Sequence, residues 1–179
     1  MKMKLSLLGA GCVLLISTIS AMAVEQPNRQ KAIQTLHQAY QKFTAGDAIE
    51  GLKGVEAALF IDPNLAIANI VRAEFAMQEQ DWPTAQKYFE RGLSLLKEPN
   101  QPLSPSPEIE ITPKEIEGDA CCFLGYVYIK LAQKASRSGD SAAEQKYLEI
   151  AHKSLKDGLK LSPGNEAREL AEGLLKMFR

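Results

Sequence analysis

The chain has few of the residues on which metal and catalytic sites usually depend. Its 179 residues include three cysteines and two histidines, His37 and His152, which are far apart in sequence. Neither histidine has another histidine or a cysteine at the helical spacing of metal ligands, whereas a zinc site usually needs about four ligands. A phosphate-binding loop, a dinucleotide fingerprint and a GxSxG elbow are all absent. We therefore expect no metal ion, no cofactor and no enzyme activity, with both histidines on solvated helix surfaces.

An excess of positive charge is also absent. The chain has 21 basic and 22 acidic residues, and loss of Lys2 and Lys4 with the first 23 residues would leave a formal charge of about −3. Nucleic-acid-binding proteins draw affinity from a strong positive field, and peripheral membrane proteins often carry polybasic runs. Neither pattern occurs here, so we expect no nucleic-acid partner.

The apolar run near the N-terminus is too short to favour a membrane-spanning helix. Residues 5–19 give about 15 residues, whereas a span needs about 20. Lys2 and Lys4 precede the run, and residues 21–23 (AMA) form a small-x-small cleavage site. We interpret residues 1–23 as a secretory signal peptide removed before Val24, which would place the protein in a periplasm, in an organelle or thylakoid lumen, or outside the cell. An uncleaved anchor is the alternative, and the one case in which we expect a membrane contact.

The cysteines beyond this segment, Cys121 and Cys122, are adjacent. An exported protein meets oxidising conditions, but two neighbouring cysteines form no disulfide framework. On a helix their side chains point about 100° apart, because a turn takes about 3.6 residues. We expect buried free thiols. The alternative is a thiol-dependent redox factor, which would need a lowered thiol pKa and a nearby base.

The chain does contain an internal repeat with a period of 34 residues. Residues 32–64 and 66–97 each predict a helix, a short turn and a second helix from the spacing of their apolar residues. A shift by the period places Ala39 on Ala73 and Ala58 on Gly92, so that small residues coincide. Such units bury their apolar faces only by stacking on one another. We expect the small residues Ala73, Ala85 and Gly92 to be buried where helices cross.

Residues 98–117 interrupt this repeat. They contain five of the nine prolines, which cannot continue a helix. We interpret them as a proline-rich insertion that connects two repeats. A proline-rich ligand for an aromatic groove is the alternative.

A third repeat follows at residues 118–163. Its second half is offset by 66 residues from the second repeat and its first half by 52, so 14 residues have been added around the turn at 138–140. Seven extra residues in each helix are close to two full turns, which preserves the packed face and lengthens the hairpin. Residues 165–178 predict one more amphipathic helix, which would cover the last apolar surface of the array.

Residues 123–128 (FLGYVY) contain the Leu-Gly-x-x-Tyr pattern, and with the period of 34 the chain resembles the tetratricopeptide repeat (TPR) family. It departs from the family pattern at Thr35 and Asn69, in place of tryptophan, and at Gln38 and Arg72, in place of leucine. The resemblance implies an all-α domain over residues 24–179. Its fold would be a right-handed superhelix of about three helical hairpins with a C-terminal capping helix.

The resemblance also implies a concave groove, lined by the first helix of each repeat, that binds extended peptides or helices. Carried over by position, the groove residues are Ile33, Leu36, Tyr40, Phe43, Ile67, Ile70, Glu74, Met77, Cys122, Tyr126 and Ile129. Chaperone-cofactor members of the family clamp a carboxylate there with lysine, asparagine and arginine. This chain instead has Leu36, Tyr40, Val71, Cys122 and Tyr126 at those sites, so we expect no carboxylate clamp.

An apolar, aromatic groove has two interpretations. It either binds an apolar segment of a protein partner, or it is filled by the capping helix or the insertion of the same chain. We expect a non-catalytic adaptor or assembly factor that acts outside the cytoplasm. The alternatives are the redox factor described above and a structural homo-oligomer.

Overall fold

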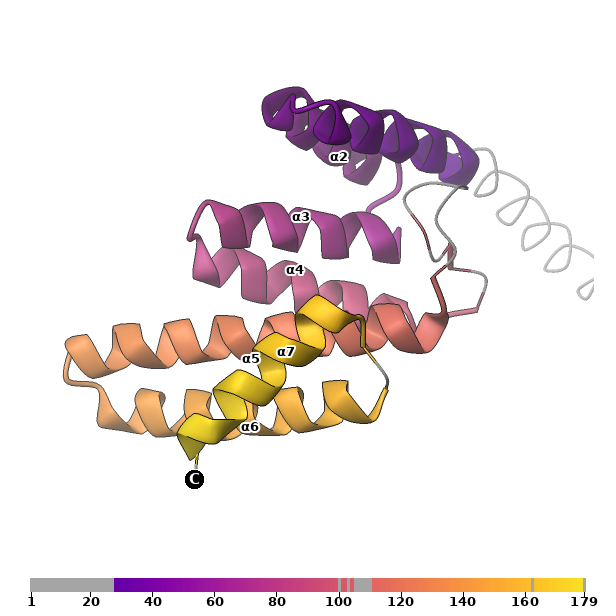
Figure 1. Ribbon diagram of the computed structural model, residues 1–179. Helices are drawn as coiled ribbons and strands as arrows, with labels where there is room; N and C mark the ends of the chain where they lie inside the picture. The colour runs from indigo at the N-terminus through magenta and orange to yellow at the C-terminus, as the bar shows by residue number, and fades with distance from the viewer. Residues whose placement is uncertain (1–27, 100, 103, 105–110, 162, 179) are drawn as a thin grey trace, which may run out of the picture.

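The computed structural model describes residues 28–99, 101–102, 104, 111–161 and 163–178, and it is helical over most of them. A first helix at residues 28–44 is followed by further helices, which form antiparallel pairs stacked on one another (Figure 1). They are α2 (Ala48–Ile61), α3 (Ala66–Gln78), α4 (Trp82–Leu95), α5 (Pro113–Arg137), α6 (Ser141–Lys160), α7 (Asn165–Leu175) and the 3-10 helix η1 (Lys176–Phe178). The predicted all-α class is confirmed. The predicted signal peptide lies outside the described residues.

The same kind of turn joins the two helices of each hairpin. One residue in each turn has a positive φ, and these residues are Gly46 (90°), Gln80 (59°) and Gly139 (75°). The next residue is an aspartate whose side chain accepts a hydrogen bond from the backbone N–H three residues later. These aspartates are Asp47, Asp81 and Asp140. Each aspartate therefore satisfies an unpaired N–H group at the start of the second helix.

Small residues let the paired helices approach closely. A Cβ atom added to Gly92 on α4 would lie 2.6 Å from Cγ1 of Ile70 and 3.2 Å from the carbonyl oxygen of Ala66, both on α3. Ala73 and Ala85 are fully buried, and Gly92 is buried as well. The prediction that these three small residues lie at helix crossings is confirmed.

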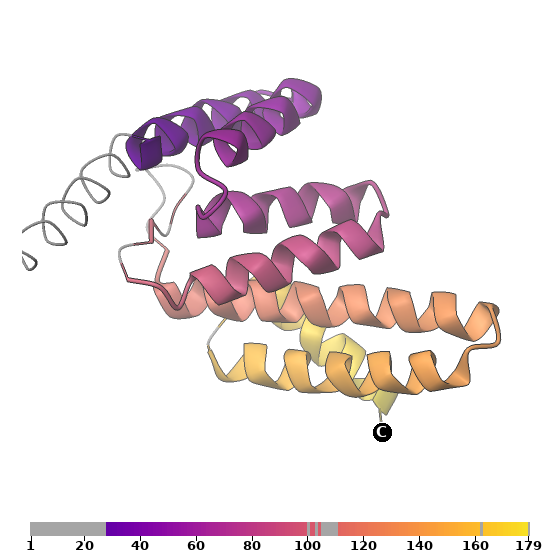
Figure 2. The same cartoon turned by 180° about the vertical axis from the view of Figure 1, so that it is seen from behind.

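The third hairpin is longer than the second, as the offsets predicted. Helix α5 has 25 residues and α6 has 20, against 13 for α3 and 14 for α4. Both views show the tip of the α5–α6 hairpin extending past the ends of α3 and α4 (Figures 1 and 2). The face of α5 that packs on α6 is kept, with Cys122 opposite Gly158.

The insertion is shorter than the sequence predicted. Helix α5 begins at Pro113, so residues 113–117, which we assigned to the insertion, are its first turn. Proline fits the first position of a helix because its fixed φ is helical and no N–H is needed there. The side chain of Thr112 accepts a hydrogen bond from the backbone N–H of Glu115 at 3.1 Å and caps this new start. Proline content alone misplaced this boundary.

The beginning of the insertion docks on the turn between α2 and α3. The side-chain amide of Gln101 donates to the carbonyl oxygen of Asn64 at 3.1 Å, and its oxygen accepts from the N–H of Ala66 at 3.1 Å. At the other end of the insertion, Ile111 packs against the core. Residues 100, 103 and 105–110 lie outside the described residues.

Helix α7 covers the end of the stack. It packs across α5 and α6 (Figure 1), where Ala167 and Ala171 are buried. The ring of Phe178 stacks on His152 with centroids 5.0 Å apart. His152 is therefore half-buried, and so is His37, which hydrogen-bonds to Gln41. Both histidines therefore lie on helix surfaces, as expected, but each is only partly exposed to solvent.

Candidate functional site

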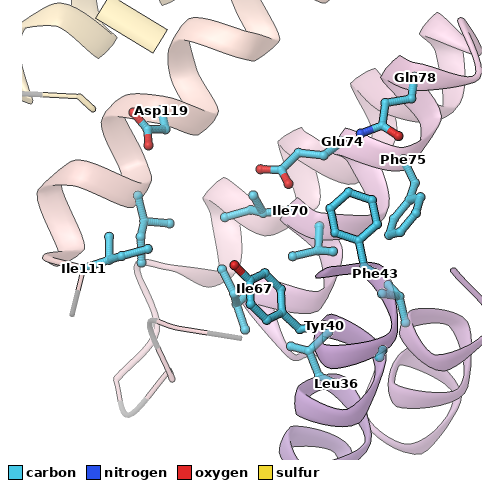
Figure 3. Close-up of a pocket in the computed structure, with 14 residues that line it drawn as sticks. Leu36, Tyr40, Phe43, Ile67, Ile70, Glu74, Phe75, Gln78, Ile111 and Asp119 are labelled. Atoms are coloured by element: carbon cyan, nitrogen blue, oxygen red, sulfur yellow. The ribbon is translucent and has the colours of Figure 1, made fainter. Parts of the chain in front are cut away.

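A cavity of about 260 Å³ lies between the first helix, α3 and the beginning of α5 (Figure 3). It forms because residues at helical spacing on the first helix and on α3 face each other, while Ile111 and Ile116 close a third side. Most of its walls are aliphatic or aromatic. The lining residues are Leu36, Ala39, Tyr40, Phe43, Val55, Ile67, Ile70, Val71, Glu74, Phe75, Gln78, Ile111, Ile116 and Asp119.

The structure brings six of the predicted groove residues together in this cavity. They are Leu36, Tyr40, Phe43, Ile67, Ile70 and Glu74. Met77 and Tyr126 instead line a second, more open pocket. Ile33 is half-buried against the core, whereas Cys122 and Ile129 are buried inside the stack, with Cys122 facing Gly158. Cys122 and Ile129 therefore do not line either pocket, and partner binding by the other residues stays a prediction.

The second pocket is aromatic and basic. The rings of Trp82 and Tyr126 meet edge to face with centroids 5.8 Å apart. The ammonium group of Lys130 lies 4.9 Å from the Tyr126 ring centroid and 5.9 Å from that of Trp82, which are cation–π distances. Gln78 lines both this pocket and the cavity, so the two sites adjoin at the C-terminal end of α3.

The carboxyl group of Glu74 points into the cavity (Figure 3). Burial, together with smaller effects of the carboxylates of Asp119 and Glu166, raises the pKa of Glu74 to about 7. Burial also raises the pKa of Asp119, although a hydrogen bond from the N–H of Gly164 at 2.7 Å opposes this shift. None of the described lining residues is a lysine, arginine or histidine. The cavity is therefore apolar and carries two carboxyl groups without a basic neighbour in its wall.

Sequence reasoning missed Asp119, Ile111 and Ile116, because it placed residues 111 and 116 in the insertion and 119 at the start of a repeat. A signal for the earlier helix start was present. Thr112 and Glu115 form an S/T-x-x-E capping pattern, with Pro113 at the first helical position. With α5 begun at Pro113, the helical spacing places Ile116 and Asp119 on one face.

The two cysteines are free thiols in an environment that opposes reactivity. Burial raises the pKa of Cys121 to about 11 and that of Cys122 to about 12. Reactive cysteines have a lowered pKa because the thiolate is the nucleophile. At neutral pH both groups are thiols, which is unfavourable for the redox alternative.

The described residues also lack two features that would indicate other classes of site. No three acidic, histidine or cysteine side chains in this part of the chain are grouped so that they could hold a metal ion. None of the described helices is long and apolar enough to cross a bilayer.

Comparison with known proteins adds information about the fold. No family model matches the sequence, and no curated protein matches it. Among solved structures, the N-terminal domain of stress-induced protein-1 (STI-1) from C. elegans is similar, with a TM-score of 0.55 and 13% sequence identity. The match covers 82% of this chain and 96% of that one. A likeness at this identity shows the fold alone, and it confirms that this chain has the predicted tetratricopeptide-like helical repeat fold.

Proposed function

We propose that the protein is a non-catalytic adaptor or assembly factor that binds an apolar segment of a protein partner in the groove formed by the cavity and the adjoining aromatic pocket. We place its action outside the cytoplasm, on the basis of the signal-like residues 1–23. The observation that carries the proposal is the cavity of about 260 Å³ lined by Tyr40, Phe43 and Ile70. Aromatic and aliphatic walls of this kind suit a buried anchor of a partner.

The described elements of the chain leave this groove unfilled. Helix α7 packs on α5 and α6, where its buried alanines lie, and does not line the cavity. Ile111, from the end of the insertion, forms a wall of the cavity. These positions favour a partner segment as the occupant over filling by the capping helix.

Selection of short random peptides displayed on phage, with the full chain as target, tests the proposal. We expect enrichment of peptides with apolar and aromatic residues. Tyr40→Ala should weaken a selected peptide at least about tenfold by calorimetry, since truncation of a central interface tyrosine that acts as a hot spot costs about 2 kcal/mol or more. Phe60→Ala is the matched control, because Phe60 on α2 is 91% exposed and lines neither pocket.

Two outcomes would overturn the proposal: no enrichment above an unrelated protein, or equal affinity for the parent and Tyr40→Ala. Separate measurements address the alternatives. Rapid thiol titration of the folded protein near neutral pH would favour a redox factor, and a multiple of the monomer mass by light scattering would favour a structural homo-oligomer.

A further inference from the structure

Glu74 is an unusual residue for an apolar cavity. It lies on α3 among Tyr40, Phe43 and Ile70, and its carboxyl group points into the open space (Figure 3). Within the described part of the chain, the Glu74 carboxyl group forms no hydrogen bond or salt bridge. Glu74 is half-buried, and a carboxylate that is partly withdrawn from water is unfavourable unless another group pairs with it. The fold therefore holds an acidic group where its charged form lacks a partner.

The titratable groups that face Glu74 add negative charge and no positive charge. Asp119 lies on the opposite wall, from α5, and the carboxylate of Glu166 acts on Glu74 from α7. The remaining titratable group in the wall is the Tyr40 hydroxyl, from the first helix. The described walls supply no basic side chain, so a cation that neutralises these acids must come with a ligand.

The shape of the cavity limits the ligand further. A volume of about 260 Å³ is slightly below the ~300–1,000 Å³ typical of sites for drug-sized ligands, and it suits a single long side chain. Lysine and arginine have apolar stems that can cover apolar walls while the charged end reaches an acid. Phe43 and Phe75, whose rings meet edge to face with centroids 5.3 Å apart, supply such a wall.

We propose that this cavity anchors a basic side chain, lysine or arginine, of the partner's apolar segment, with the cation between Glu74 and Asp119. The inference rests on the proposed function and adds the chemistry of its anchor. A basic anchor is opposite in charge to the carboxylate that chaperone-cofactor tetratricopeptide proteins bind, and for which this chain lacks the clamp residues. Charge complementarity favours a basic anchor, because a cation converts the half-buried, unpaired carboxylate of Glu74 into half of an ion pair.

Peptide selection on the full chain at about pH 8, above the pKa of Glu74, tests the inference. We expect the selected peptides to share one lysine or arginine between apolar residues. Replacement of that residue by norleucine, which keeps the stem and removes the charge, should weaken binding to the parent about tenfold or more. Glu74→Gln should remove this difference, whereas Glu172→Gln, an exposed acid on α7 outside the cavity, should keep it.

A pH series adds a readout that a purely structural role would not give. Affinity for the basic peptide should rise as the pH rises through about 7, because Glu74 becomes ionised, and Glu74→Gln should flatten this rise. The norleucine peptide should show little change. Circular dichroism should show that Glu74→Gln keeps its helical content.

The possible failures are distinguishable. Enrichment of apolar peptides without a basic position would overturn the basic anchor and leave the proposed function standing. Absence of any enriched peptide would overturn both. Competition by free n-butylamine at the concentration of the selected peptide would identify a site for small amines and would also overturn the peptide anchor.

Discussion

At the scale of single residues, Glu74 links stability to pH. Its pKa is about 7 in the folded chain and near 4.5 in the unfolded chain, so folding is favoured while the group is protonated. This contribution is complete below about pH 4.5. It is lost as the pH rises through about 7, where the folded protein must ionise a group that lacks a partner.

We therefore predict that Glu74→Gln stabilises the protein at about pH 8 by about 1–3 kcal/mol, because it removes a half-buried charge that lacks a partner. Near pH 4.5 the variant and the parent should be about equally stable. Urea unfolding at both pH values measures the difference, with Glu172→Gln as control. Equal stability of Glu74→Gln and its parent at pH 8 would show that the Glu74 carboxylate is solvated.

Gln80 is the second residue whose effect on stability can be tested, because its backbone conformation is strained. It has a φ of 59° in the α3–α4 turn, where the other two hairpins have Gly46 and Gly139. A residue with a Cβ atom in this region costs about 1–2 kcal/mol relative to its ordinary conformation. Glycine adopts the conformation freely but loses more entropy on folding.

We predict that Gln80→Gly raises the stability by about 0.5–1 kcal/mol, since relief of the φ strain exceeds the entropic loss. Gly139→Ala should have the opposite sign, because it introduces the same strain at a turn with open space around it. Thermal unfolding of the two variants measures both effects. A lower melting temperature for Gln80→Gly would mean that its side chain makes contacts that outweigh the strain.

At the scale of elements, the repeat arithmetic predicted most of the fold. The offset of 66 residues places Gly158 on Gly92, and both lie at helix crossings in the structure. Small residues in a repeat indicate helix crossings, because two helices in close contact leave no room for a larger side chain at the crossing point. The start of α5 was predicted less well, because the proline content of the insertion outweighed the capping pattern of Thr112 and Glu115.

Gly158 and Gly173 give a matched test of these crossings, since both are helical glycines. A Cβ atom on Gly158 would lie 2.6 Å from Sγ of Cys122 and 2.8 Å from the carbonyl oxygen of Gly118, whereas nothing lies within 4 Å of one on Gly173. We predict that Gly158→Ala destabilises the protein by about 1–3 kcal/mol through overpacking. Gly173→Ala should stabilise it by about 0.5–1 kcal/mol, because alanine favours the helix. Urea unfolding measures both, and a stabilising Gly158→Ala would contradict the close α5–α6 contact.

At the scale of the whole molecule, the sequence predicted which residues line the cavity better than it predicted the chemistry of the cavity. The positions from Leu36 to Glu74 that line the cavity were carried over from the groove-facing sites of the tetratricopeptide repeat, with which the period of 34 residues aligns this chain. The acidic character was not predicted, since it arises where Asp119, from another repeat, lies across the cavity from Glu74. Cys122 was misplaced because the helix that carries it is covered by α6 on that side, where Gly158 admits its sulfur atom.

A substitution in the aromatic pocket distinguishes an open groove from a groove that is filled by the same chain. Tyr126 is half-buried, contacts Trp82 edge to face and lies beside Lys130. In an open groove, Tyr126→Glu places a carboxylate near Lys130 and water. It should then lose only the aromatic contact, about 0.5–1.5 kcal/mol, or a few degrees in melting temperature for a chain of this size.

The same Tyr126→Glu change should weaken a selected peptide about tenfold or more, because the charge replaces an apolar contact surface that adjoins the cavity through Gln78. Ala57→Glu, which adds one carboxylate to an exposed position of α2, should leave both properties unchanged. Calorimetric titration and thermal melts of the two variants measure these effects. A fall of about ten degrees for Tyr126→Glu would mean that the new charge is buried under another part of the chain, which would contradict an open groove.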